Sequence, residues 1–91
     1  MNVRVPWRVV DVTALPNFCL SVRFADQTHG EVDLARLIQG PAAGVFASLA
    51  DPAAFERVSI EDGAVAWPGG LDLAPDAMYD DIKATGRCVL G

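Results

Sequence analysis

The chain has 91 residues, of which 52% are hydrophobic, and its formal net charge is −5 at pH 7. This length allows a single domain over residues 1–91 with one core, and the hydrophobic content excludes intrinsic disorder. The seven Lys and Arg residues are scattered singly along the chain, whereas nucleic acid and anionic membranes require a concentrated positive field. We therefore expect no nucleic acid and no membrane among its partners.

Cysteine usage and the absence of long apolar runs indicate a cytoplasmic protein. Cys19 and Cys88 are too few for the disulfide framework of a small secreted domain, and they form no Cys-x-x-Cys pair. No basic segment precedes an apolar run near the start, and no apolar stretch approaches the ~18 residues of a membrane-spanning helix. We expect two reduced thiols.

The first third of the chain predicts three strands. Residues 8–15 are rich in β-branched side chains and end at a Pro-Asn turn signal. A third strand is expected at residues 29–34, after a tight turn, and should pair antiparallel with the second. The second strand, residues 18–24, alternates in side-chain type, and its buried face is predicted to hold Phe18, Leu20, Val22 and Phe24.

Three short helical segments are expected between the third and fourth strands. Asp33 can cap a helix over residues 34–38. Asp51 and Pro52 are typical of an N-cap and of the first helical position. Between them, residues 44–50 carry apolar side chains at helical spacing: Val45, Phe46 and Leu49.

The strongest hairpin signal in the chain is Asp62-Gly63, because both residue types can adopt the backbone conformation of a tight two-residue turn. It joins predicted strands at residues 56–60 and 64–67. Their core-facing side chains are expected to be Val58, Ile60, Val65 and Trp67. Pro68-Gly69-Gly70 then ends the second of these strands, since proline cannot donate to a ladder and glycine permits positive φ.

A last helix is predicted to begin at Pro75 and Asp76 and to end at Gly86, followed by a short tail at residues 87–91. Together these elements predict an α+β fold. We expect a small antiparallel β-sheet in meander order, short helices between strands three and four, and the C-terminal helix packed on the sheet.

Residue types that carry catalysis or metal chemistry are sparse. His29 is the only histidine, and its position beside a turn favours an exposed loop residue over a catalytic one. One histidine and two distant cysteines give no zinc ligand set, and no phosphate-binding glycine loop is present. We predict no catalytic residue, no metal and no cofactor, and we expect that the chain is not an enzyme.

Carboxylates gather in the second half of the chain: Glu61, Asp62, Asp72, Asp76, Asp80 and Asp81. A hard cation such as calcium would require several oxygens on one loop. Asp80 and Asp81 lie well down the predicted helix, so a solvated acidic face and complementation of the helix dipole are the favoured interpretations.

Trp67, Asp72, Asp76 and Tyr79 form the candidate interaction or ligand site, because aromatic residues dominate binding hot spots. The alternative is structural. Trp67 and Tyr79 would then pack the last strand on the last helix, while Asp72 would accept hydrogen bonds from nearby N–H groups. We favour the structural role for Trp67.

The order of these motifs resembles the bacterial domain of unknown function 2442 family. The matching residues are Phe24, Asp26, Val32, Asp33, Leu34, Leu49, Asp51, Pro52, Phe55, Trp67, Pro68, Gly70, Asp72, Leu73, Pro75, Asp76 and Tyr79. Two positions depart from the family pattern. Gln27 stands where a turn glycine is usual, and Ala74 stands where Ser or Thr often caps the last helix.

The resemblance implies a compact α+β domain and supplies no established activity or catalytic residue. Some members are similar to the N-terminal part of proteins that end in a helix-turn-helix domain. Others are encoded beside a small protein of another family, in an arrangement that looks like a toxin–antitoxin pair.

Two functional hypotheses follow. The first is a non-catalytic, antitoxin-like module that binds a protein partner, with a basic partner favoured by the acidic charge. The second is a ligand-sensing domain with a small-molecule pocket near Trp67 and Asp72. A homodimer is also expected, because the chain is rich in apolar residues and should carry unpaired strand edges.

Overall fold

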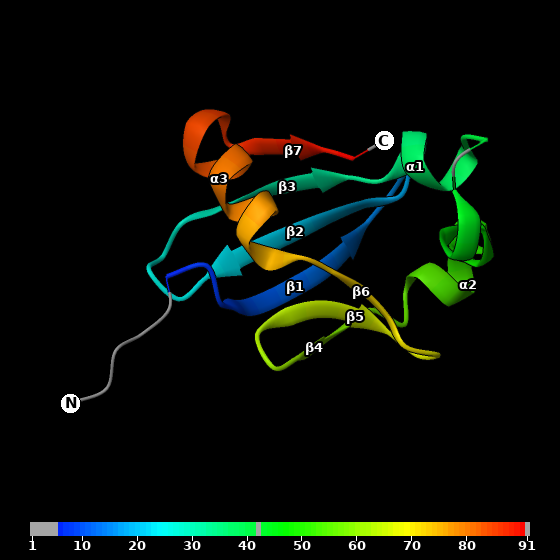
Figure 1. The fold of residues 1–91 in the computed structure, drawn as a ribbon, viewed down its shortest axis with the longest axis horizontal. Coiled ribbons are helices and arrows are strands. Elements are labelled where there is room, and N and C mark those ends of the chain that lie inside the picture. Colours follow the sequence, from blue (N-terminus) through cyan, green and yellow to red (C-terminus); the bar gives the residue numbers. More distant parts are fainter. Residues whose placement is uncertain (1–5, 42, 91) are drawn as a thin grey trace.

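Strands and helices follow one another in groups along the part of the chain that the computed structural model describes, residues 6–41 and 43–90 (Figure 1). The strands are β1 (Val9–Leu15), β2 (Cys19–Phe24), β3 (His29–Asp33), β4 (Ser59–Glu61), β5 (Ala64–Trp67), β6 (Leu71–Leu73) and β7 (Arg87–Val89). The helical segments are α1 (Ala35–Gln39), the 3-10 helix η1 (Gly44–Ala50), α2 (Pro52–Phe55) and α3 (Pro75–Thr85).

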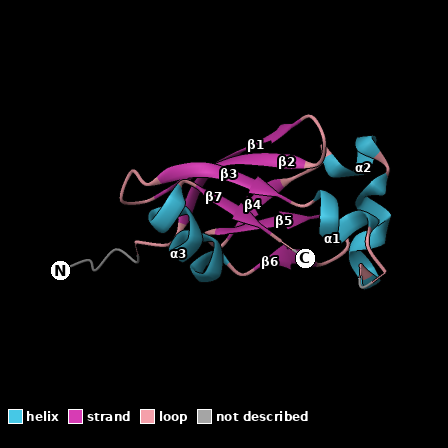
Figure 2. Cartoon of the chain, turned by 90° about the horizontal axis from the view of Figure 1, so that it is seen from above, coloured by secondary structure: helices cyan, strands magenta, loops and turns pink. Residues whose placement is uncertain are grey.

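The strands form two sheets. One has four strands in the order β1-β2-β3-β7, and the other has three in the order β4-β5-β6. Figures 1 and 2 show α1, η1 and α2 together at one end of the molecule and α3 at the opposite end. Met78 and Ile82 of α3 are buried in the shared core. The predicted α+β fold is confirmed, including the helices after the third strand and the C-terminal helix packed on the sheet.

The two predicted hairpins are present. β2 pairs antiparallel with both β1 and β3. Asp62 and Gly63 join β4 to β5 with φ values of 50° and 77°, the left-handed pair that a tight two-residue hairpin requires. Gln27, in the turn between β2 and β3, also has a positive φ of 76°. A residue other than glycine loses about 1–2 kcal/mol of conformational free energy in this backbone conformation.

The sheet arrangement is more complex than a single meander. Residues 71–73, for which no strand or helix was predicted, form β6 beside β5. Residues 87–89, predicted as tail, form β7, which pairs parallel with β3; Gly91 lies outside the described residues. A strand of three residues is too short to show alternation, so its pairing depends on the surrounding fold rather than on a local pattern.

The core contains most of the expected apolar residues, including Leu20, Val22, Phe24, Val65 and Trp67. The prediction for Ile60 is wrong, since it is 36% exposed because β4 is an edge strand of the smaller sheet. In the predicted helical segment at residues 44–50, η1 turns mainly Leu49 inward and leaves Val45 69% exposed.

One hydrogen bond joins the two sheets near the start of β1. The Val9 N–H donates to the Gly63 carbonyl over 2.8 Å, which ties the β4–β5 turn to the larger sheet. Val12 and Ala14 of β1 lie on the core side and are half-buried, whereas Asp11 and Thr13 are exposed on the opposite face.

Candidate functional site

Trp67 lies inside the core rather than on a binding surface. It is 2% exposed, and its indole N–H donates to the Phe55 carbonyl over 2.8 Å. Its ring also lies 5.9 Å from the Phe55 ring. A buried indole whose single donor is satisfied has no polar group left for a ligand. The structure thus places Trp67 where it joins β5 to α2.

Tyr79 has a different set of partners. Its hydroxyl donates to the Asp26 carboxylate over 2.6 Å, and its ring stands edge-on to Phe24 with centroids 5.2 Å apart. The Lys83 ammonium lies 3.5 Å from the same carboxylate and 5.5 Å from the Tyr79 ring centroid. This cluster fastens the β2–β3 turn to α3. Trp67 does not take part, because it packs against α2 at the other end of the molecule (Figure 1).

The hydrogen bonds at Asp26 change the acidity of its carboxyl group. The Tyr79 hydroxyl and then the Thr28 backbone N–H hold the pKa of Asp26 well below its usual range. Both donors stabilise the ionised carboxylate, which is the physical cause of the shift.

Asp72 and Asp76 are exposed and lie outside both aromatic clusters. Asp72 stands opposite Ala66 in the β5–β6 pair. Asp76 is in the first turn of α3, where its carboxylate accepts the Ala77 N–H over 3.0 Å. The N-cap of this helix, Ala74, has no side-chain cap, so Asp72 does not replace the missing hydroxyl. The four candidate residues therefore do not converge on one site.

The remaining candidates for chemistry are also dispersed. His29 is exposed at the start of β3. Both cysteines are free thiols, and burial followed by the Asp81 carboxylate raises the pKa of Cys88 to about 11. Among the described residues, no three His, Cys, Asp or Glu side chains come close enough together to hold a metal ion. In the same part of the chain, no helix is long and apolar enough to cross a membrane.

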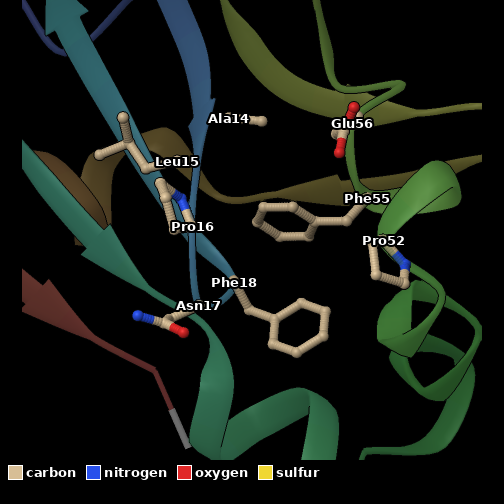
Figure 3. A pocket seen from close by; sticks show the side chains of 8 residues that line it. All are labelled: Ala14, Leu15, Pro16, Asn17, Phe18, Pro52, Phe55 and Glu56. Atoms are coloured by element: carbon tan, nitrogen blue, oxygen red, sulfur yellow. The ribbon is translucent and has the colours of Figure 1, made fainter.

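A concave surface lies between the turn that follows β1 and helix α2 (Figure 3). We call it the β1–α2 depression. Its volume is about 740 Å³, and it is lined by Ala14, Leu15, Pro16, Asn17, Phe18, Pro52, Phe55 and Glu56. Phe18 and Phe55 meet edge to face in it, with ring centroids 5.5 Å apart. Most of its lining is apolar, and Glu56 adds a carboxylate at the rim.

Local sequence explains how the two walls are built. On one side, the Asp51 carboxylate accepts the Ala53 N–H over 3.0 Å and Pro52 occupies the first position of α2, as predicted. On the other side, Asn17 and Phe18 have φ values of 63° and 59°. A bulky residue rarely adopts this left-handed backbone, so the turn holds the Phe18 ring in place at a conformational cost.

The sequence did not reveal the depression. Phe18 was expected on the buried face of the second strand, but it lies in the turn before β2 and is half-buried. The depression forms because this turn meets α2, which lies more than thirty residues later in the chain. The one local signal was Pro16-Asn17, which predicted a turn but not which helix would face it.

The comparisons with known proteins give a single family. The model described as "Protein of unknown function (DUF2442)" matches residues 9–84. The comparison with curated proteins gives no match, and neither does the comparison with solved structures.

Proposed function

The chain belongs to the DUF2442 family of proteins of unknown function, and we propose that it is a non-catalytic module that binds a protein partner at the β1–α2 depression. In this proposal the chain acts in the cytoplasm, as an antitoxin-like partner of a second small protein. The observation that carries it is the half-buried ring of Phe18, which packs edge to face on the buried Phe55 at a mainly apolar concavity.

Three properties of the depression support a binding role. A partly exposed aromatic ring at a concave surface, here Phe18, is typical of interface hot spots. Phe18 reaches its position through a left-handed backbone, and such strain is found disproportionately at functional sites. The polar groups at the rim, Asn17 and Glu56, are exposed and can bond to a partner after the apolar centre is covered.

Charge favours a basic partner. The chain carries a net charge of −5, and Glu56 places one carboxylate at the rim itself. Glu61, Asp62, Asp76, Asp80 and Asp81 add exposed negative charge elsewhere on the surface. A basic protein is attracted to such a surface over about a Debye length, whereas nucleic acid is repelled.

A ligand-sensing role is the second candidate, and the size of the depression favours it. A volume of about 740 Å³ falls within the range of small-molecule sites. Such sites also need several convergent polar groups to orient a ligand, and here the lining offers chiefly Asn17 and Glu56. We therefore rank this role below the protein partner.

The proposal is tested by two lysine variants of α2. Pro52→Lys introduces a charge into the depression, and Ala53→Lys introduces the same charge on the neighbouring exposed residue, which does not line it. The partner is first isolated by co-purification with the tagged wild-type chain from its source cells. Calorimetry should then show binding about tenfold weaker for Pro52→Lys than for Ala53→Lys.

Other results would reject the proposal. Equal affinities for the two variants would move the interface away from the depression. The sensing role would be favoured if a small molecule, and no protein, co-purified with the wild-type chain. That small molecule should then be lost from the Pro52→Lys variant. Hydrolysis of substrates by the purified chain would contradict a non-catalytic module.

A further inference from the structure

The backbone of β1 presents hydrogen-bonding groups along its outer edge. The Phe24 N–H donates to the Thr28 carbonyl, and the Leu34 N–H donates to the Phe18 carbonyl. The backbone groups of the even-numbered residues of β2 therefore point toward β3. Antiparallel pairing alternates between the two sides of a strand, so odd-numbered residues of β2 bond to β1. These are paired with the odd-numbered residues of β1, such as Thr13 opposite Ser21.

It follows that the N–H and C=O groups of Val12 and Ala14 point away from β2, toward the outer edge of the sheet. The smaller sheet is bonded to this edge at Val9, through Gly63, and its strands β4 and β5 both contact β1. Beyond that bond, no backbone partner for Val12 or Ala14 is found among the described residues. An unpaired edge of this kind is a template for another strand.

The β1–α2 depression lies directly beside this edge. Ala14 belongs to both, because it is a residue of the edge strand and lines the depression (Figure 3). Its methyl group is on the core side of the sheet, in the same row as Leu20 and Val32. In an antiparallel strand added to the edge, the residue opposite Ala14 would also point to the core side. Its side chain would enter the depression beside Phe18 and Phe55.

The opposite face of the added strand would meet different chemistry. Asp11 is exposed on that face of β1, and its carboxylate is only loosely paired with Arg23, at 3.7 Å. Basic side chains on the outward face of the added strand are therefore favoured by the cross-strand charge of Asp11.

We propose that β1 receives an extended segment of the partner as an additional antiparallel strand, with apolar side chains in the β1–α2 depression and basic side chains on the outer face. This inference rests on the proposed function and specifies how its partner binds. A second copy of the chain is disfavoured as the occupant, because it would bring another charge of −5 and another acidic Asp11 to the same edge.

The test uses a capped peptide of about seven residues in which lysine and valine alternate, a length that spans the edge from Val12 to Leu15 with residues to spare. In antiparallel pairing, the valines carry both the inward side chains and the N–H groups that face β1. Methylating the valine nitrogens should weaken binding about tenfold or more, as measured by fluorescence anisotropy. Methylating the lysine nitrogens is the matched control and should leave affinity within about twofold.

Amide hydrogen exchange locates the peptide on the chain. Binding should protect the Val12 and Ala14 N–H groups, while the protection of Thr13, which already faces Ser21, should stay the same. No binding of the unmethylated peptide, or equal binding of both methylated forms, would overturn the strand-addition inference. Loss of binding only on lysine methylation would overturn the antiparallel arrangement.

The partner complex separates this inference from the proposed function. Suppose that the partner binds and that Pro52→Lys weakens this binding, while the amide hydrogens of Val12 and Ala14 exchange as fast as in the free chain. Strand addition is then wrong and the proposed interface stands. If the peptide protects the edge but no protein partner is captured, the proposed function is wrong. A dimer of the chain that protects the same two amides would replace the partner with a second copy.

Discussion

Trp67 combines two stabilising interactions that a single substitution removes together. The ring is buried against Phe55, and its N–H satisfies the Phe55 carbonyl over 2.8 Å. Trp67→Ala should lower the free energy of unfolding by about 3–5 kcal/mol, the range for truncating a buried aromatic. Urea denaturation monitored by circular dichroism measures this loss.

Trp67→Phe is the control that separates the two interactions. It retains an aromatic ring but leaves the Phe55 carbonyl without its donor, so we expect a smaller cost of about 1–3 kcal/mol. A loss below about 1 kcal/mol for Trp67→Ala would mean that the ring does not support the core in solution.

The Asp26 carboxylate makes the free energy of unfolding depend on pH in the acid range. Its pKa is lowered in the folded chain by the Tyr79 hydroxyl, so the unfolded chain binds the proton more tightly. The resulting stabilisation is complete above the unfolded value of about 3.9 and is lost as the pH falls toward the folded value. Asp26→Asn should lower the urea midpoint at pH 7. The difference between the urea midpoints of the variant and the wild type should become smaller as the pH falls from about 5 to about 2.

Tyr79→Phe tests the cause of that shift. It keeps the ring against Phe24 but removes the donor, so the pKa of Asp26 should rise toward about 3.9 in an NMR titration of its carboxyl carbon. An unchanged pKa would assign the shift to Thr28 and Lys83 instead.

Trp67 and Tyr79 also show what could and could not be predicted from the sequence for single residues. Their hydrophobicity and position predicted that both would help to build the fold. Their partners differ from the predicted packing of the last strand on the last helix, because Tyr79 reaches Asp26, 53 residues earlier, and Trp67 reaches Phe55 of a different helix. Such contacts depend on the packing of whole elements and leave no local pattern.

At the scale of elements, α3 begins without a side-chain cap. Ala74 occupies the N-cap position with an extended backbone, and its methyl group cannot accept an N–H from the first turn. Ala74→Ser should raise the free energy of unfolding by about 0.5–2 kcal/mol, as measured by thermal and urea denaturation. Ala77→Ser places the same hydroxyl inside the helix at an exposed position and should give no gain. Equal effects of the two changes would show that the hydroxyl acts other than as a cap.

Elements with strong local signals were predicted well. Asp51-Pro52 begins α2, Asp62-Gly63 makes a hairpin turn, and Gly86 ends α3 with a φ of 84°. The strands β6 and β7 were missed because three residues cannot express a period of two. Both are specified by the neighbouring strand that they join, β5 and β3 respectively.

For the molecule as a whole, the packing of the turn after β1 against α2 forms a concave surface that the sequence did not indicate. The sheets are bonded where Val9 meets Gly63, and the β1–α2 depression lies farther along β1, between the turn that follows it and α2. Residues from two separate parts of the chain line it: the end of β1 with the turn after it, and α2 with the residue that follows it. Sequence analysis established the acidic charge and offered a protein partner as a hypothesis, but its candidate site was centred on Trp67, which is buried.

The net charge leads to a prediction about the rate at which the proposed partner associates. If the acidic surface attracts a basic protein, the association rate constant should fall about tenfold between about 20 mM and about 300 mM salt, while the dissociation rate changes little. Stopped-flow fluorescence measures both rates. The double variant Glu61→Gln with Asp80→Asn removes two exposed charges that do not line the depression, so the net charge changes from −5 to −3. It should associate more slowly and with a weaker salt dependence, yet dissociate at the wild-type rate. If salt instead changed only the dissociation rate, the charges that matter would lie within the interface, and long-range attraction would not guide the encounter.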